Sequence, residues 1–164
     1  MARRLTIICG LFWATVSAGE GMQVSVDTSK LQGPHPLESQ TRIAAIRDYL
    51  QAWNAMGEAF DRNRPELLDS GFTGVARDKL SGAIQQQTAL GVHTRYRNSA
   101  HNLQVVFYSS EGLSIQMIDT VQYDMQVSAG KRLVATIPET AHYVVILTPT
   151  ENRWKVRVLQ AVSD

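Results

Sequence analysis

Hydrophobic residues in the first half of the chain recur at the spacing of helices. Across residues 39–62 the large apolar side chains follow one another at steps of three, four, three and seven, at Ile43, Ile46, Leu50, Trp53 and Phe60. This spacing is typical of an amphipathic helix with one buried face. Pro65 suits the first turn of a short helix over residues 64–69. A second long helix is predicted over residues 73–90, and Gly91 is well placed to end it.

From His93 onward the hydrophobic period changes to two. Apolar residues alternate in a first strand that includes residues 103–108, and most regularly in a second strand over residues 114–128. A third strand follows over residues 133–148, and a final one opens at Trp154. Alternation of this kind predicts half-buried antiparallel strands. The sequence therefore predicts an α+β fold, in which N-terminal helices pack on a curved antiparallel sheet of four or more strands.

The first 18 residues have the pattern of a secretory signal peptide. Arg3 and Arg4 form a basic start, an apolar stretch covers residues 5–16, and small residues precede a cleavage site after Ala18. The apolar stretch is shorter than the roughly 20 residues of a transmembrane helix. We therefore expect an exported bacterial protein, periplasmic or secreted, from which this peptide is removed. Retention of the segment as an uncleaved membrane anchor is the alternative.

Residues 19–38 separate the signal peptide from the predicted domain. Several Gly and Pro residues punctuate this segment, which favours a flexible arm or linker. Residues 22–26 alternate briefly, and an extra edge strand is the alternative for them. Residues 39–164 are expected to form a single domain.

Composition excludes several classes of protein. The 164 residues carry a net charge of +1, and loss of Arg3 and Arg4 with the signal peptide would leave 14 basic and 15 acidic residues. Neither the full chain nor the processed chain has the excess of basic residues that is typical of a nucleic-acid-binding protein. The single cysteine, Cys9, lies within the signal peptide. A disulfide framework and a cysteine zinc site are therefore excluded.

Three features of the element pattern occur together. The first long helix has Trp53 near its middle, the third strand contains the segment Tyr143–Leu147, and the last strand opens with Trp154 directly after a tight turn. Over residues 40–162 this pattern resembles the nuclear transport factor 2-like superfamily, which implies a cone-shaped α+β domain. The short hairpin that the family commonly has among its helices is not evident. The superfamily includes isomerases, dehydratases, secretion-system subunits and binding domains, so the resemblance implies a fold and not an activity.

Asp119 is the strongest candidate for chemistry. It occupies an odd position in a strand whose other odd positions are apolar, so unbroken alternation would direct its carboxylate into the concave, core-facing side. A buried carboxylate is costly unless it is paired or protonated. The resemblance implies a general acid or base role for a residue placed there. The alternative is a bulge at residues 118–119 that turns Ile118 inward and Asp119 toward solvent.

His142 and Tyr143 are the candidate partners of Asp119 in acid–base chemistry. As neighbours on a strand they face opposite sides of the sheet, so only one of them can line a pocket. A solvent-facing position is the alternative for the histidine.

Further side chains are expected to line the pocket: Trp53, Tyr96, Met117 and Tyr123. A simple core role is the alternative for aromatic residues on a sheet face. A mildly basic group on the first strand suits an anion or a solvated face, and comprises His93, Arg95, Arg97 and His101. Trp53 and Trp154 are both expected to be substantially buried.

Motifs for cofactor and metal chemistry are not found. The four histidines lack the spacing of metal ligands, and the chain has neither a glycine-rich phosphate loop nor a G-x-S-x-G elbow. We therefore expect no cofactor and no metal.

The favoured function is an exported, non-catalytic binding or interaction domain with a small concave pocket. Its expected partner is a small apolar ligand or a protein, and a homodimer through the open sheet face is a further expectation. One alternative is a cofactor-free isomerase, dehydratase or hydrolase that uses Asp119. The other is a membrane-tethered subunit of a secretion or envelope assembly, which requires an uncleaved N-terminal segment.

Overall fold

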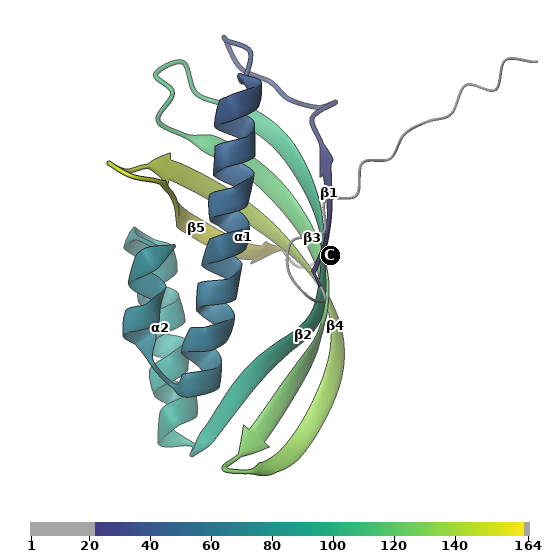
Figure 1. Cartoon of the computed structure of the whole chain (residues 1–164), viewed down its shortest axis with the longest axis vertical. Coiled ribbons are helices and arrows are strands. Elements are labelled where there is room, and N and C mark those ends of the chain that lie inside the picture. Colours follow the sequence, from purple (N-terminus) through teal and green to yellow (C-terminus); the bar gives the residue numbers. More distant parts are fainter. Residues whose placement is uncertain (1–21, 163–164) are drawn as a thin grey trace, which may run out of the picture.

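Helices cover one face of a curved sheet in the computed structural model, which describes residues 22–162 (Figure 1). The helical segments are α1 (Ser39–Arg62), the 3-10 helix η1 (Pro65–Ser70) and α2 (Gly74–Ala89). The strands are β1 (Gln23–Asp27), β2 (Val92–Tyr108), β3 (Ile115–Ala129), β4 (Arg132–Pro149) and β5 (Trp154–Val162). The signal peptide predicted for residues 1–18 lies outside the described residues.

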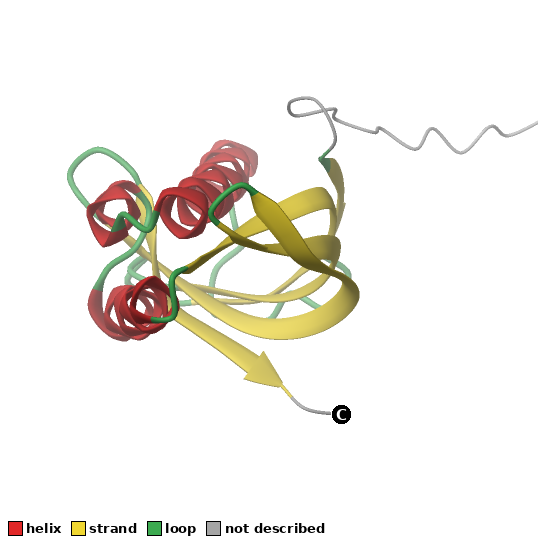
Figure 2. Ribbon diagram, turned by 90° about the horizontal axis from the view of Figure 1, so that it is seen from below, coloured by secondary structure: helices red, strands yellow, loops and turns green. Residues whose placement is uncertain are grey.

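The five strands form one sheet in sequence order. β1 runs parallel to β2, and every other neighbouring pair is antiparallel. Figure 2 shows the helices gathered on one side, while the strands curve around and away from them. The expected α+β architecture, with helices on a curved and mainly antiparallel sheet, is confirmed.

β1 lies within the segment for which the sequence favours a flexible arm. Residues Gln23–Asp27 pair with Ala100–Gln104 of β2, and Val24 packs against the core. Gln104 adds a side-chain hydrogen bond from Nε2 to Oδ2 of Asp27 at 3.1 Å. This pairing makes residues 23–27 an edge strand of the sheet, which was the alternative to a flexible arm for residues 22–26.

α1 buries one stripe against the sheet, as its spacing predicts. The buried side chains begin at Ala45 and end at Phe60. Ile43, the first member of the predicted stripe, is 62 % exposed because it precedes the part of the helix that is covered. Asn63 ends the helix in a left-handed conformation with φ of 53°, and its N–H donates to the carbonyl of Ala59.

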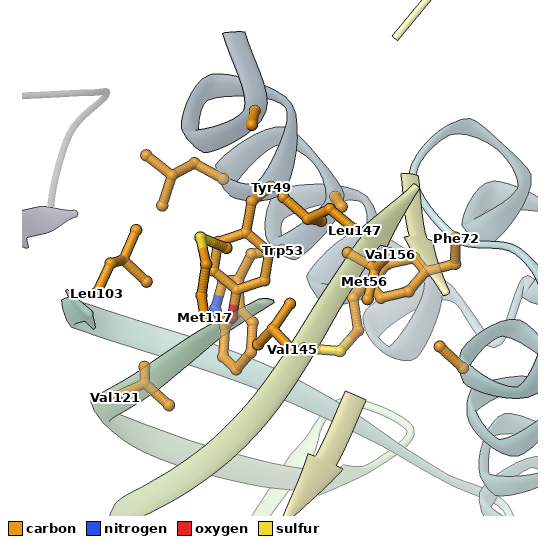
Figure 3. Close-up of a cluster of buried hydrophobic side chains, with 14 of the residues drawn as sticks. Tyr49, Trp53, Met56, Phe72, Leu103, Met117, Val121, Val145, Leu147 and Val156 are labelled. Atoms are coloured by element: carbon orange, nitrogen blue, oxygen red, sulfur yellow. The ribbon is translucent and has the colours of Figure 1, made fainter. Parts of the chain in front are cut away.

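The core forms where α1 meets the middle of the sheet. Figure 3 shows Tyr49, Trp53 and Met56 of α1 among side chains that include Met117 and Val145. Trp53 is buried, as expected from its position in the stripe.

Trp154 is only partly buried, which is less than expected. It opens β5 beside the buried side chain of Asp48, whose Oδ2 accepts a hydrogen bond from the Trp154 backbone N–H at 2.8 Å. Asp48 thereby fixes the start of the last strand to the first helix.

An irregularity in β2 decides which of its side chains face the helices. The register with β3 shifts between Arg97 and Ala100, and Asn98 there has a φ of 56°. The shift moves the inward-facing positions from even to odd numbers. The buried positions are accordingly Thr94 before the shift and Ser99, His101, Leu103 and Val105 after it.

Gly71 stands at a close approach between α1 and the connection from η1 to α2. A Cβ atom on Gly71 would lie 2.5 Å from Cβ and 2.6 Å from Cα of Ala52. The Gly71 carbonyl also accepts a hydrogen bond from the N–H of Val156 at 2.8 Å. The connection is therefore held between the helix and β5, and no side chain fits at this position.

We expect Gly71→Ala to destabilise the protein by roughly 1–3 kcal/mol, because α1 must shift to accommodate the methyl group. Gly82→Ala is the matched control, since nothing lies within 4 Å of a Cβ at this position in α2. The control should stabilise the helix by about 0.5–1 kcal/mol. Urea unfolding of both variants checks the prediction, and equal stabilities for the two would contradict it.

Candidate functional site

Asp119 lies at the centre of a buried polar cluster between α1 and the sheet. Its Oδ2 accepts a hydrogen bond from the Tyr49 hydroxyl at 2.5 Å and lies 2.8 Å from Nδ1 of His101. Tyr49, His101 and Asp119 are all buried, and the carboxylate is completely inaccessible. We refer to these three residues as the Asp119 cluster.

The register of β3 explains the inward position of this carboxylate. Its pairing with β2 and with β4 continues without a shift through Ile118 and Asp119. Asp119 is fully buried, whereas Ile118 is 36 % exposed on the other face. The alternative of a bulge that turns Asp119 outward is therefore wrong.

The contacts of Asp119 set the hydrogen-bonding state of the histidine. An ionised carboxylate only accepts, so Nδ1 of His101 must carry the proton of that hydrogen bond. In the neutral ring, Nε2 then has a free lone pair. Asp119 in this way orients the imidazole and presents Nε2 as a hydrogen-bond acceptor or a base.

Several polar atoms in and beside the cluster have no partner. Within the described part of the chain, Oδ1 of Asp119, Nε2 of His101 and Nε1 of Trp53 are buried without a hydrogen bond. Such atoms are rare in proteins, and each costs roughly 1–3 kcal/mol when it is left unpaired. The cluster therefore holds hydrogen-bonding capacity that its own residues do not use.

Aromatic rings surround these atoms. The Trp53 ring lies 4.8 Å from that of His101, nearly perpendicular to it. Tyr96, Tyr123 and Tyr143 each lie 6.0–6.3 Å from Trp53, measured between ring centroids. The cluster thus has an aromatic wall centred on Trp53.

Burial changes the acidity of the tyrosines. Burial, reinforced by the negative charge of Asp119, raises the pKa of the Tyr49 hydroxyl well above its ordinary value. Burial and the neighbouring Tyr143 likewise raise the pKa of Tyr96 and of Tyr123. All three hydroxyls therefore stay protonated at neutral pH.

A cleft between α1 and the first part of β2 leads toward this wall. It has a volume of about 200 Å³, and Trp53 and Tyr96 belong both to its lining and to the aromatic wall. Charged residues form its rim, where Nε of Arg95 and Oδ1 of Asp61 make an ion pair at 2.6 Å. Arg97 also lines the cleft and is exposed. Trp53 stands between this opening and the Asp119 cluster.

The structure brings together only some of the predicted site residues. Tyr143 pairs with Asp119 across β3 and β4 and joins the aromatic wall. Tyr123 also belongs to that wall. Met117 is fully buried in the core and is absent from the lining of the cleft.

His142 is not a partner of Asp119. It lies on the opposite face of the sheet, where its Nδ1 is 3.0 Å from Oγ1 of Thr120. Strand alternation allowed only one of His142 and Tyr143 to face inward, and the register selects Tyr143.

The histidine that does contact Asp119 is His101, which the sequence analysis placed in a mildly basic group. Alternation could have identified it, because His101 has the same odd parity as the buried Leu103 and Val105. Tyr49 was missed as well, although it precedes Trp53 by four residues and therefore lies on the same face of the helix. The hydrogen bond between Tyr49 and Asp119 spans 70 residues and has no local sequence signal.

Two further searches cover the described residues. In residues 22–162, no group of three or more His, Cys, Asp or Glu side chains is arranged to hold a metal ion. None of the helices in that range combines the length and the hydropathy needed to cross a membrane.

Comparison with solved structures identifies the same fold elsewhere. The intermembrane space region of the chloroplast protein ARC6 superimposes with a TM-score of 0.59 at 14 % identity, over 79 % of this chain and 100 % of that one. The chain shares this cone-shaped α+β fold. A scytalone dehydratase-like protein from Novosphingobium aromaticivorans gives a TM-score of 0.49 at 13 % identity, over 77 % of this chain and 89 % of that one. No protein-family model and no curated protein matches the chain.

We expect stability to fall as the pH rises above about 10, the ordinary pKa of a tyrosine. An unfolded tyrosine ionises there, whereas the folded Tyr49 keeps its proton because its pKa is raised. The unfolded state then binds fewer protons than the folded state and is favoured by increasing pH. Tyr49→Phe should lower the melting temperature at pH 7, through the lost hydrogen bond to Asp119, but should flatten its decline between about pH 9 and 11.

Thermal unfolding of wild type and Tyr49→Phe across this range measures the effect. Between pH 7 and 9 no tyrosine ionises in either state, so the difference in melting temperature should stay constant there. Parallel curves through pH 11 would contradict the assignment.

Proposed function

We propose that this domain binds a small, mainly apolar molecule through one hydroxyl or carbonyl group. The observation that carries the proposal is the set of unpaired polar atoms inside an aromatic wall, at Trp53, His101 and Asp119. A nuclear transport factor 2-like domain with a concave binding site fits both the sequence pattern and the arrangement of helices on the sheet.

The unpaired atoms favour a particular ligand chemistry. Nε1 of Trp53 is a donor, Oδ1 of Asp119 is an acceptor, and Nε2 of the neutral His101 ring is a second acceptor. A hydroxyl group can accept from the indole and donate to either acceptor. A carbonyl group can only accept, so it can bond the indole N–H but neither of the two acceptors.

The surroundings favour an uncharged ligand. The aromatic wall and the buried side chains beside it offer apolar contact but no opposite charge beyond the already paired Asp119. Desolvation of a charged ligand would therefore cost more than these contacts return. The cleft beside Trp53 and Tyr96 is the route by which a ligand would approach, with Trp53 moving aside.

Phenol and toluene form a matched pair of probes that differ in the hydroxyl group. A purely hydrophobic pocket would bind toluene more tightly, because toluene gains more from leaving water. We expect phenol to bind more tightly, by about tenfold for one net hydrogen bond. NMR titration of the Trp53 indole N–H resonance measures both affinities and reports directly on the proposed donor.

Two variants separate the polar contacts from general packing. His101→Phe keeps a ring but removes both nitrogen atoms, and should abolish the preference for phenol. Tyr49→Phe removes a hydroxyl that is already bonded to Asp119, and should keep that preference. Equal or stronger binding of toluene to wild type would overturn the proposal.

Acid–base catalysis without a cofactor is the second candidate. It is favoured by the contact of Nδ1 of His101 with Asp119, which leaves Nε2 as a base oriented by a carboxylate. Trp53 adds a donor that could stabilise negative charge on a substrate oxygen. Binding is placed first because it requires only the hydrogen bonds of the unpaired atoms, whereas catalysis also requires a substrate proton positioned at Nε2 of His101.

We also propose that the protein is exported, to the periplasm or outside the cell, as a non-catalytic member of the superfamily. Support comes from the basic and apolar pattern of residues 1–18 and the small residues that precede Gly19. The mass of the protein recovered from its bacterial host should correspond to a chain that begins at Gly19. A mass that includes residues 1–18 in a membrane fraction would instead favour the tethered-subunit alternative.

A further inference from the structure

β4 extends well beyond its neighbour β5. The pairing of these strands covers only His142–Pro149 of β4. On that side of the sheet, Arg132–Ala141 has no partner strand among residues 22–162. Its backbone N–H and C=O groups on this side are therefore available to another chain.

Some other parts of the sheet edge have partners. β1 pairs with Ala100–Gln104 of β2, and the connection before α2 bonds to β5 at Val156, through Gly71 and Thr73. The first part of β4 is different, because it projects past the end of β5 as the long hairpin with β3 (Figure 1).

The composition of this edge favours strand pairing. Leu133 and Val134 are each 54 % exposed and Ile137 is 39 % exposed. The stretch 133–138 contains no charged residue and is rich in β-branched side chains. Natural proteins usually guard such an edge with charges. Here the stretch is interrupted by Pro138 and by a register shift at Val134, which lies between the residues paired with Val127 and Ser128.

The charges that flank the stretch are complementary between two copies of the chain. Lys131 and Arg132 precede it, and Glu139 follows it. When two copies run antiparallel, the basic pair of each copy comes beside the glutamate of the other. A twofold axis near Ala135 would therefore repeat both the apolar and the ionic contacts.

We propose that the protein forms a homodimer through antiparallel pairing of the β4 edges over Leu133–Ile137, which joins the two sheets into one. This interface lies at the sheet edge, in place of the open sheet face expected from the sequence. Pro138 has no N–H to donate, so it ends the intermolecular ladder on one side and limits its length. The proposal is independent of ligand binding near Asp119.

Sedimentation of the purified protein over a range of concentrations tests the dimer. Val134→Lys places two like charges close to the twofold axis and should weaken dimerisation by at least about tenfold. Val26→Lys is the matched control, because Val26 is also an exposed valine of an edge strand, at the opposite side of the sheet. It should leave the dimer unchanged.

A charge exchange tests the orientation. Glu139→Lys alone, and Lys131→Glu combined with Arg132→Glu, should each produce monomers by placing like charges together. An equimolar mixture of these two variants should recover dimers, since opposite charges then meet again. Circular dichroism checks that each variant is folded.

Three results would overturn the proposal: a wild-type monomer at every concentration, a dimer that Val134→Lys leaves intact, and failure of the mixture to recover dimers. Loss of the dimer in Ile118→Lys, on the outer sheet face, with retention in Val134→Lys would assign the interface to that face.

Discussion

The hydrogen bonds to one buried carboxylate join the first long helix to the middle of the sheet. Asp119 of β3 accepts from Tyr49 of α1 and contacts His101 of β2 through the same oxygen. Because a carboxylate without partners is strongly disfavoured in the core, helix and strands must meet in this register. The same contacts orient the imidazole, beside which three buried polar atoms have no partner. Core formation and the proposed binding chemistry therefore depend on the same group.

The irregularity in β2 is as necessary to this site as the carboxylate. Without the register shift between Arg97 and Ala100, the strand could not place both Tyr96 and His101 on the side of Trp53. Asn98 accommodates the shift because asparagine tolerates a positive φ better than most residues do, and its Nδ2 donates to Asp124 at 2.8 Å. The same irregularity also gives Ser99 and Arg97 to the lining of the cleft.

Period and parity were sufficient for most of the fold. They predicted the long helices, the antiparallel strands and the inward direction of Asp119, because each depends on the geometry of a single element. They did not identify the partners of Asp119. The choice between His101 and His142 depends on a register shift within one strand and on the pairing of two others. Likewise, the order of residues 23–27 follows from backbone pairing with β2 across more than 70 residues, which has no local sequence signal.

The contact between Asp48 and the backbone of Trp154 has a consequence for the way in which the chain reaches its native state. It closes a separation of 106 residues and joins the first helix to the first residue of the last strand. Folds dominated by such distant contacts form slowly, because much chain entropy is lost before stabilising contacts are made. During synthesis the end of α1 that packs on β5 stays uncovered until the final strand has left the ribosome, although β2–β4 can cover the rest of its stripe earlier. Apolar surface therefore remains exposed late in synthesis, when it is open to aggregation or to binding by a chaperone.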